Sequence, residues 1–505
     1  MKSKEEQKKI GAFIKSLREQ RGMTQQELAL ALRTSQSAVA RMETGRQNLS
    51  TQALAHIGRV LGRKIVALTN SIDFQIEGGR KLHGTVTTNA SKNGALGLLA
   101  ASVLNDSKTT LHGIPRIEEV HRFIEILTSI GFSIEWVGKN SVVITPPRRV
   151  RVKTCNRASA EKIRSTLILL GGLIHRVKLF QIPHAGGCKM GERTIAAHRY
   201  GLEKFGVHIT TRENRYAVTV GKLKPADVVL YETSDTATEN LLIAAARIPG
   251  VTRISFASSN YQVQEVCFFL EKLGVMIEGV GTSTLTVHGI PSINMPVEYY
   301  NSEDPIESMM FLSAAIVTGS RLTVARCPIY FLQLELLRLE KMGLRYQAGT
   351  PYLSYNRKTR LADVTVFPSQ LRAPSDKILA QPYPGINTDN LPFFVPIATQ
   401  AAGTTLIHDW MWENRAIYFT ELNRLGAKVT LADPHRVFVE GSTPLKAAQV
   451  VCPPALRPAM IILIAMLAAK GTSVLRNVYS INRGYEEVAE RLNAIGAKIE
   501  IVRGM

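Results

Sequence analysis

From residue 72 onward, the hydrophobic and polar positions repeat one signature six times: an amphipathic helix ends at a glycine, and a strand follows. Each copy reads like L-E-K-F-G-V-H-I, and the glycines stand at 131, 206, 274, 343, 426 and 496. Glycine adopts the left-handed conformation that ends a helix, and the alternating apolar residues after it predict a strand. The copies are 68 to 83 residues apart, and this period is longer than that of a solenoid repeat. The pattern therefore predicts a duplicated α/β architecture.

Residues 7–64 show a different pattern, that of several short helices. Gly22 ends the first helix, and Thr24 with Glu27 forms a capping box at the start of the second. Ser35 is the expected N-cap of a third helix, Gln36 to Thr44. Two short helices joined by a tight turn predict a helix-turn-helix.

Charge separates the same two regions. The whole chain has 62 Lys and Arg against 41 Asp and Glu, and its first 64 residues hold 13 and 5 of these. A small, strongly basic module indicates an anionic partner, with nucleic acid first. The alternative is a solvated basic face that only aids solubility.

Composition excludes several classes of protein. With 45% hydrophobic and 20% charged residues, the chain is globular, and 505 residues predict about three to four domains. The longest apolar run, Ala459 to Ala469, is too short to span a membrane, and the charged N-terminus shows no secretory signal. Five cysteines without CxxC spacing argue against a disulfide framework or a zinc site. We therefore expect a cytoplasmic protein with no metal and no cofactor.

Residues that interrupt the repeats are candidates for chemistry. Ser91 to Gly94 places a lysine and an asparagine at a helix start, as an anion site or as a simple capping turn. Cys188 lies in a glycine-rich loop and is followed by Lys189 and Arg193, whose charges favour a thiolate over the usual buried, inert cysteine. Asp389 follows a Pro-Gly turn and is either a general base or an N-cap.

Two further segments place arginines near turns. These are Glu413 to Arg415 and Asn482 to Glu486, which hold Arg415 and Arg483. Arginine binds carboxylates and phosphates through two parallel hydrogen bonds, so both segments are candidate clamps.

The N-terminal module resembles the Cro/C1-type repressor domain family, through M-T-Q-Q-E-L-A and T-S-Q-S-A-V-A-R-M-E-T-G-R. The resemblance implies that Gln36, Ser37 and Arg41 face the groove of double-stranded DNA and that Gln25 touches phosphate. Glutamine pairs with adenine and arginine with guanine, which suits that role. The resemblance is compatible with a homodimer. The alternative is a helical dimerisation cap that does not read DNA.

Residues 72–505 resemble the UDP-N-acetylglucosamine 1-carboxyvinyltransferase family. The motifs occur in the family's order: E-G-G-R-K-L-H-G, S-K-N-G, I-R-S-T, G-G-C-K-M-G-E-R, A-T-E-N, G-T-S-T-L-T, T-D-N, W-E-N-R and N-R-G-Y-E. The implied fold is a two-domain inverse α/β barrel of six repeated units, behind a small all-α domain. We expect the helix-turn-helix domain at 1–66, one transferase domain at 72–91 plus 303–505, and the other at 92–302.

This resemblance implies transfer of enolpyruvyl from phosphoenolpyruvate to the 3-hydroxyl of UDP-N-acetylglucosamine, a step toward peptidoglycan precursors. Cys188 matches the thiol that protonates or transiently bonds phosphoenolpyruvate, and Asp389 matches the base at the acceptor hydroxyl. Lys92, Arg193 and Arg483 match the cationic clamp on phosphoenolpyruvate. The other substrate-binding positions that the resemblance implies are Asn93, Arg164, His198, Ser234, Met411, Arg415 and Arg457.

The chain departs from the family's pattern at four positions. Ala455 stands where the family commonly has an active-site Asp, and Pro305 replaces an Arg. Ala196 and Asn482 each replace an Asp. These changes indicate a divergent paralogue, with a shifted acceptor as one outcome.

Two other hypotheses stay open at this point. The first is a DNA-binding transcription regulator whose transferase-like body senses nucleotide-sugar or phosphoenolpyruvate. The second is the sister family that acts on shikimate 3-phosphate, which fits less well because the cysteine loop and the Lys-Asn pair point to the nucleotide-sugar branch.

Overall fold

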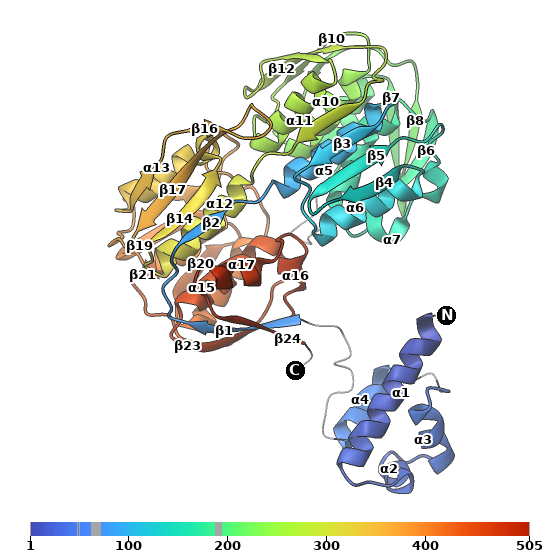
Figure 1. The fold of residues 1–505 in the computed structure, drawn as a ribbon, viewed down its shortest axis with the longest axis vertical. Coiled ribbons are helices and arrows are strands. Elements are labelled where there is room, and N and C mark those ends of the chain that lie inside the picture. The colour runs from blue at the N-terminus through green and yellow to red at the C-terminus, as the bar shows by residue number, and fades with distance from the viewer. Residues whose placement is uncertain (1, 48, 50, 62–71, 187–193, 504–505) are drawn as a thin grey trace. The chain divides into compact units, whose positions relative to one another are not determined.

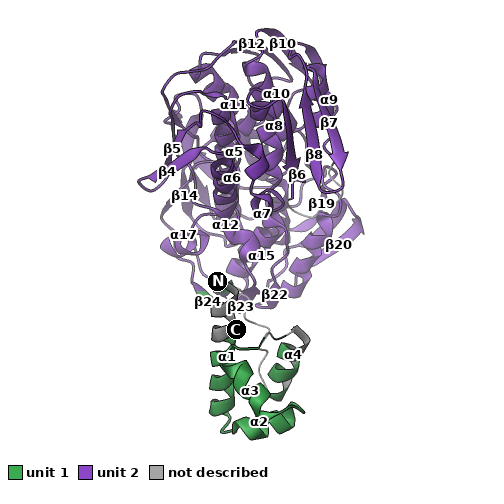
Figure 2. Cartoon of the chain, turned by 90° about the vertical axis from the view of Figure 1, so that its right-hand side faces the viewer, with its two compact units in different colours: residues 1–74, 501–505 green, residues 75–500 purple. Residues whose placement is uncertain are grey.

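The computed structural model describes residues 2–47, 49, 51–61, 72–186 and 194–503. The chain forms two compact units, residues 1–74 with 501–505 and residues 75–500, coloured separately in Figure 2. We call residues 2–61 the helical unit and residues 72–503 the body, because the strands at 72–78 and 499–503 each run across the boundary between the two.

Four helices make the helical unit, and local capping defines two of them. They are α1 (Lys2–Gln20), α2 (Gln25–Ala31), α3 (Gln36–Glu43) and α4 (Thr51–Val60). The predicted capping box is confirmed, because the Glu27 amide donates to Thr24 Oγ1 at 3.2 Å and the Thr24 amide donates to Glu27 Oε2 at 2.6 Å. Ser35 caps α3 as predicted, accepting from the Ala38 amide. The helix-turn-helix is therefore present.

A small apolar core and one buried ion pair hold these helices together. Arg18 of α1 donates through Nε to Glu43 Oε1 of α3 at 2.6 Å, and both side chains are buried. A buried pair of this kind is costly to break, since removing one partner leaves an uncompensated charge. The core residues are Ile14, Leu17, Leu28, Ala29, Val39, Ile57 and Leu61.

The described strands of the body form six sheets of three to five strands. Four of them share one arrangement of four strands. The first two strands are parallel, and the second with the third and the third with the fourth are antiparallel. This recurrence agrees with the six copies counted in the sequence. The predicted α/β fold of repeated units is therefore correct.

Three of the sheets form what we call the second lobe (Figure 1). Their strands are β3 (Thr109–His112), β4 (Ser133–Val137), β5 (Ser141–Thr145), β6 (Leu179–Pro183), β7 (Val207–Arg212), β8 (Arg215–Val220), β9 (Asp227–Val229), β10 (Gly250–Ser255), β11 (Met276–Glu278), β12 (Thr284–Gly289) and β13 (Val297–Tyr300). Their helices are α5 (Lys92–Ala101), α6 (Glu118–Ser129), α7 (Arg157–Ala160), α8 (Leu169–Leu173), α9 (Ala196–Lys204), α10 (Asp235–Ala246) and α11 (Tyr261–Lys272).

The other three sheets form the first lobe. Their strands are β1 (Ile72–Gly78), β2 (Thr85–Thr87), β14 (Leu322–Cys327), β15 (Arg345–Ala348), β16 (Tyr352–Leu353), β17 (Arg360–Phe367), β18 (Ile378–Leu379), β19 (Gly403–His408), β20 (Lys428–Asp433), β21 (Arg436–Gly441), β22 (Gln449–Val451), β23 (Gly471–Arg476) and β24 (Ile499–Arg503). Their helices are α12 (Pro305–Val317), α13 (Gln333–Lys341), α14 (Phe394–Thr399), α15 (Leu456–Ala468), α16 (Tyr479–Asn482) and α17 (Val488–Ala494). The exact domain boundaries at residues 92 and 303 stay predictions.

Hydrophobic helices lie inside both lobes. Every residue of α15 from Leu456 to Leu467 is buried, and α10 is buried from Ala237 onward. A helix that is apolar on all faces belongs in a core, so the run Ala459 to Ala469 belongs largely to the interior of the first lobe. Among the described helices, none has both the length and the apolar character that crossing a bilayer requires.

Two chain segments cross between the lobes side by side. Ala90 pairs with Glu303 in an isolated antiparallel bridge, and the Ser91 amide donates to the Ser302 carbonyl at 2.7 Å. The Asn301 side chain donates to the Ser91 carbonyl, also at 2.7 Å. Residues at the start of α5 and α12 are therefore brought together at the junction of the lobes.

The six signature glycines all adopt positive φ, as the sequence predicted. Their φ angles run from 82° at Gly426 to 114° at Gly131. Residues other than glycine rarely adopt positive φ, because their Cβ then comes too close to the following carbonyl oxygen.

Substitution of one such glycine should test this constraint. Gly426 ends its helix at φ 82° and ψ 9°, and an added Cβ would meet only ordinary contacts at 3.8 Å or more. Gly426→Ala should therefore lower the free energy of unfolding through backbone strain alone, by about 1–2 kcal/mol. Thermal unfolding of the full chain measures this, with Gly426→Asn losing less because asparagine tolerates the left-handed region.

The matched control is Gly349→Ala, because φ at Gly349 is not positive and an added Cβ would again find only ordinary contacts, at 3.5 Å. Equal losses for Gly349→Ala and Gly426→Ala would show that φ is not the cause.

Candidate active site

Lys92 and Asn93 begin α5 at the junction of the lobes. Ser91 caps the helix, since its Oγ accepts from the Gly94 amide at 3.0 Å, so the predicted capping turn is present. Lys92 Nζ lies 2.9 Å from Glu119 Oε2 of α6. Asn93 Nδ2 donates to Tyr261 Oη and to Gln262 Oε1, both at 3.0 Å.

Asp389 lies in the first lobe between two arginines. Asn387 Oδ1 accepts from the Asp389 amide at 2.8 Å, which fixes the turn. Arg457 Nη2 donates to Asp389 Oδ2 at 3.0 Å, and Arg415 Nη1 lies 3.8 Å from Oδ1. Burial alone would raise the pKa of Asp389, but the charges of Arg457 and Arg415 hold that pKa below its usual value. Asp389 is therefore an ionised carboxylate at neutral pH.

Arg457 joins this carboxylate to a tyrosine. Its Nη1 donates to Tyr485 Oη at 2.6 Å, and its side chain is buried in the first turn of α15. Burial opposes its charge, yet Tyr485, Asp389 and Asp304 raise the pKa of Arg457 overall. Ala455, the residue where the family commonly has an Asp, occupies the N-cap of α15 and supplies no capping side chain.

Arg415 lies deeper, in a buried ion pair. Only 1% of its side chain is exposed, and its Nε donates to Asp409 Oδ2 at 2.5 Å. Its Nη2 donates to the Thr388 carbonyl at 2.6 Å. Arg415 thus supports the segment that carries Asp389.

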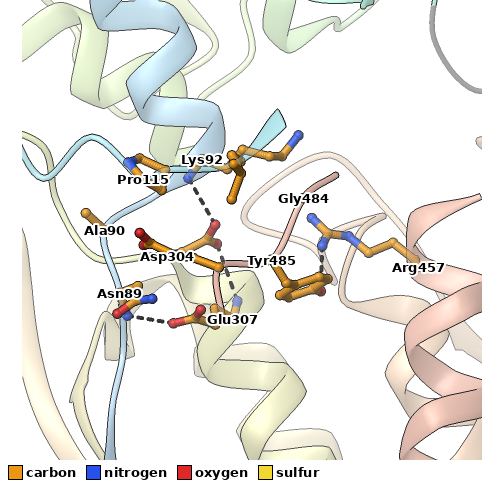
Figure 3. A pocket seen from close by; sticks show the side chains of 11 residues that line it. Asn89, Ala90, Lys92, Pro115, Asp304, Glu307, Arg457, Gly484 and Tyr485 are labelled. Carbon is orange, nitrogen blue, oxygen red and sulfur yellow. Dashed lines mark hydrogen bonds between the residues drawn. The ribbon is translucent and has the colours of Figure 1, made fainter. Parts of the chain in front are cut away.

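Figure 3 shows a pocket at the junction of the lobes, which Lys92 and Arg457 both line. Lys92 and Pro115 from the second lobe face Asp304, Tyr485 and Arg457 from the first. Its lining residues are Asn89, Ala90, Lys92, Pro115, Ile117, Asp304, Glu307, Arg457, Gly484, Tyr485 and Glu486.

Two carboxylates of this region escaped the sequence analysis. Glu119 is desolvated, which would raise its pKa, but the charges of Lys92, Arg483 and Arg457 lower that pKa overall. Asp304 caps α12, and burial raises its pKa. Both stand in the first turn or at the cap of a helix, where acids are common, so the sequence alone offers no signal that distinguishes them.

Arg483 lies beside Glu119, as the effect of its charge on that carboxyl group shows. The Glu119 amide also approaches the Arg483 carbonyl at 3.4 Å. The structure thus brings together Lys92, Arg457, Asp389 and Arg483 from four distant parts of the sequence.

Other predicted residues lie on the surrounding elements. Arg164 Nη2 donates to the Thr194 carbonyl at 2.8 Å, and Ser234 caps α10. His198 is buried in α9, with its ring nitrogens 2.9 Å from Asn240 Nδ2 and 3.3 Å from Thr236 Oγ1. Met411 is half-buried in the segment after β19.

One carboxyl group links α10 to the site. The charge of Asp389 contributes to raising the pKa of Asp235, after burial as the main cause. The first turn of α10 therefore lies near Asp389, beside the Ser234 cap.

Cys188 and Arg193 lie outside the described residues. Cys155, Cys267, Cys327 and Cys452 are free thiols. Burial raises the pKa of Cys155 to about 11 and the pKa of Cys327 and of Cys452 to about 12. Within the described ranges, no group of three or more His, Cys, Asp or Glu side chains is placed to hold a metal ion.

In the helical unit, the expected DNA-reading residues are exposed on α3. Gln36, Ser37 and Arg41 all face solvent, and Ser37 Oγ lies 3.0 Å from Ser35 Oγ. Gln25 instead donates through Nε2 to Glu43 Oε2 at 2.9 Å, so its side-chain amide connects α2 to α3 in this structure.

Comparison with known families divides the chain in the same way. Residues 76–492 match the family model described as EPSP synthase (3-phosphoshikimate 1-carboxyvinyltransferase). Residues 9–68 match the model described as a helix-turn-helix domain.

Curated relatives cover the body almost completely. A UDP-N-acetylglucosamine 1-carboxyvinyltransferase of Bradyrhizobium diazoefficiens is 33% identical over 433 residues, which are 85% of this chain and 98% of the relative. The protein of the same name from Treponema denticola is 33% identical over 429 residues, 85% of this chain and 99% of the relative.

Solved structures share the fold. The enolpyruvyl transferase NikO from Streptomyces tendae has a TM-score of 0.74 at 24% identity, covering 86% of this chain and all of that one. EPSP synthase from Acinetobacter baumannii has a TM-score of 0.68 at 18% identity, covering 85% of this chain and all of its own.

The raised thiol pKa values make cysteine labelling selective. A pKa near 11 or 12 reduces the thiolate fraction at pH 7.5 about a hundredfold or more relative to a free thiol. Iodoacetamide should therefore label Cys188 long before the other four cysteines, as peptide mapping by mass spectrometry would show. Cys188→Ser should abolish the fast label, whereas Cys155→Ser should leave it. A fast label on any other cysteine would contradict the assignment of Cys188.

Proposed function

Because the chain belongs to the UDP-N-acetylglucosamine 1-carboxyvinyltransferase family, we propose that its body transfers enolpyruvyl from phosphoenolpyruvate to the 3-hydroxyl of UDP-N-acetylglucosamine. Phosphate is released, and the helical unit binds double-stranded DNA. The observation that carries the enzymatic part is Asp389, which is bonded to Arg457 where the lobes meet and whose pKa the charges of Arg457, Arg415 and Lys92 hold below its usual value.

The reaction needs an addition followed by an elimination. The acceptor hydroxyl adds to C2 of phosphoenolpyruvate while C3 receives a proton; loss of phosphate and of one C3 proton then restores the vinyl group. Asp389 is deprotonated and takes the hydroxyl proton as general base. Lys92 and Arg483 supply positive charge for the phosphate and carboxylate of phosphoenolpyruvate. Cys188 donates the proton to C3 or bonds C2 transiently.

The substitution at Ala455 makes Asp389 more important. An Asp at the N-cap of α15 would stand two residues before Arg457 and would add a second carboxylate there. With Ala455 in that place, Asp389 is the carboxylate that hydrogen-bonds Arg457. We infer that Asp389 serves as the base without help from this position.

The regulatory alternative receives less support. A body that only sensed its ligands would not need Asp389, Lys92 and Arg483 together, yet the chain retains all three. The free thiols of Cys155, Cys267, Cys327 and Cys452 suit a reducing compartment, and we propose the cytoplasm.

Phosphate release from phosphoenolpyruvate tests the proposed reaction. We expect release with UDP-N-acetylglucosamine and none with phosphoenolpyruvate alone or with shikimate 3-phosphate. Asp389→Asn should lower kcat about 10²–10⁴-fold, the usual contribution of a general base. Release from phosphoenolpyruvate with shikimate 3-phosphate but not with UDP-N-acetylglucosamine would assign the chain to the sister reaction instead.

Ala455→Asp is the companion variant. If the missing carboxylate limits the rate, this substitution should raise kcat with UDP-N-acetylglucosamine. An unchanged rate would mean that the site has adapted to another acceptor, and other UDP-sugars would then be screened.

DNA binding is tested by selection of the full chain on random duplexes. We expect a palindromic preferred site and an affinity that falls with salt, because Lys and Arg contacts release counterions. Arg41→Ala and Gln36→Ala should each reduce discrimination by about 1–3 kcal/mol. Lys15→Ala on α1 is the matched control and should keep the sequence preference. If the chain selects no sequence at moderate salt, the helical unit does not read DNA.

A further inference from the structure

A turn of the first lobe holds a helix of the second lobe. This turn, Ser354–Thr359, joins β16 to β17, and we call it the clasp. Its Asn356 Nδ2 donates to Glu265 Oε2 of α11 at 3.1 Å, and its Lys358 Nζ lies 2.9 Å from Glu271 Oε2 of the same helix. The clasp closes on itself, since the Ser354 amide donates to the Thr359 carbonyl at 2.8 Å.

The clasp also touches the segment that crosses between the lobes. Ser354 Oγ donates to Glu303 Oε2 at 2.7 Å, and the Tyr355 ring lies 5.8 Å from that of Tyr300. Several consecutive residues of one short turn therefore contact the second lobe or the crossing segment. In Figure 1 this turn follows β16, and the hydrogen bonds place it against α11.

Glu265 is the buried centre of these contacts. Only 3% of it is exposed, and each polar group that bonds it is a donor. Tyr299 Oη donates to Oε1 at 3.0 Å, the Ser302 amide donates to Oε1 at 3.1 Å, and Asn356 donates to Oε2. Asn356 cannot reverse its amide without loss, because its Oδ1 accepts from the Lys358 and Thr359 amides at 2.9 Å. At Oε2 the hydrogen bonds thus favour a carboxylate, because the Asn356 amide cannot accept a proton, whereas Tyr299 Oη at Oε1 can both donate and accept.

The same helix reaches the active site at its other end. Tyr261 Oη and Gln262 Oε1 hold Asn93, the neighbour of Lys92. Asn260, the N-cap of α11, accepts through Oδ1 from Asn387 Nδ2 at 3.2 Å, and Asn387 orients the Asp389 amide. About one turn of rigid helix separates Tyr261 from Glu265. A shift of α11 at the clasp would therefore move Asn93 relative to Asp389.

We propose that Glu265 is a positioning residue, whose carboxylate, bonded to Asn356, sets α11 between the lobes and so sets Asn93 against Asp389. Its kinetic consequences rest on the function proposed above. Misplacement by an ångström is enough to cost about a hundredfold in rate when reacting groups must align.

The surroundings of Glu265 make this contact sensitive to pH. Burial raises the pKa of Glu265 to about 7, although Asn356, Tyr299 and the Ser302 amide act against it, and the Glu303 charge raises it further. Glu303 is itself paired with Arg326, whose Nε donates at 2.8 Å. Other acids that border α11 are Glu271, paired with Lys358, and Glu239 and Asp235 of α10, of which Asp235 accepts from Asn260 Nδ2 at 3.0 Å. Burial also raises the pKa values of Glu239 and Asp235, so substitution of Glu265 is what identifies the acid behind a change of rate near neutral pH.

The sign of the effect follows from its donors. Below pH 7 a proton on Oε2 would face the Asn356 amide, which cannot accept it, and a proton on Oε1 would be donated to Tyr299 Oη. In both cases the negative charge that strengthens the Asn356 bond is lost, so the clasp loosens and kcat should fall. Above pH 7 the carboxylate accepts all its donors. Folding free energy runs the other way: a raised pKa means that the folded state binds more protons, so ionisation of Glu265 lowers stability between about pH 4.5 and 7.

The test is the pH profile of kcat for phosphate release, from pH 6 to 9, in the full chain. Wild type should lose rate below pH 7. Glu265→Gln cannot ionise, and it sets its amide against that of Asn356. Its kcat should therefore be about tenfold or more below that of wild type. Between pH 8 and 6 its kcat should fall only as far as the titration of other groups requires. Asn356→Ala removes a donor that lowers the pKa of Glu265, so in this variant the acid limb of the profile, the fall of kcat toward low pH, should begin above pH 7. Lys358→Met breaks only the outer pair with Glu271 and should keep the limb near pH 7.

Amide hydrogen exchange supplies a readout that needs no substrate. Glu265→Gln should increase exchange at residues 354–359 and 260–265, whereas Lys358→Met should leave residues 260–265 as in wild type. Faster exchange in an enzyme that shows no transferase activity would support the clasp and refute the proposed reaction. A Glu265→Gln variant with the wild-type rate, the wild-type limb and unchanged exchange would overturn the inference.

Discussion

The ion pair between the buried Arg457 and the partly buried Asp389 is the constraint on which the active site depends. Arg457 stands in the first turn of α15, whose other faces are apolar and buried, so its largely desolvated charge must be paired. Asp389 and Tyr485 satisfy it, and they come from segments far from Arg457 in sequence. A charge left alone in such a place would cost several kcal/mol. The same pairing keeps Asp389 ionised, so one interaction serves both folding and chemistry.

The duplicated architecture explains why this pair lies beside Lys92. Each lobe is built from three similar sheets, and the chain passes between lobes twice, with the crossing segments bonded side by side near Ala90 and Glu303. The helices that start at these crossings, α5 and α12, bring Lys92 and Asp304 to the same junction. The Ser354–Thr359 clasp bonds the lobes at a second place, through α11. Substrate placement then depends on how the two lobes are held, as well as on the residues that touch substrate.

The helical unit adds a different kind of recognition to this body. Its stability comes from a small core and the Arg18–Glu43 pair, all within its own residues, and its exposed α3 face carries Gln36, Ser37 and Arg41. Because this core is the unit's own, the DNA binding proposed above rests on the helical unit alone.

The sequence by itself determined the features that depend on neighbours along the chain. Gly426 and its five counterparts have positive φ, and Thr24 with Glu27 forms a capping box, because both depend on residues a few positions apart. The family motifs likewise indicated Lys92 and Asp389. Only the tertiary structure decided the partners of those residues. Glu119, which pairs with Lys92, and Glu265, which Asn356 holds, are ordinary helical acids in the sequence. The donors and charges that act on these two carboxyl groups lie 27 or more residues away in the sequence. No local sequence pattern predicts which residues so far apart will meet.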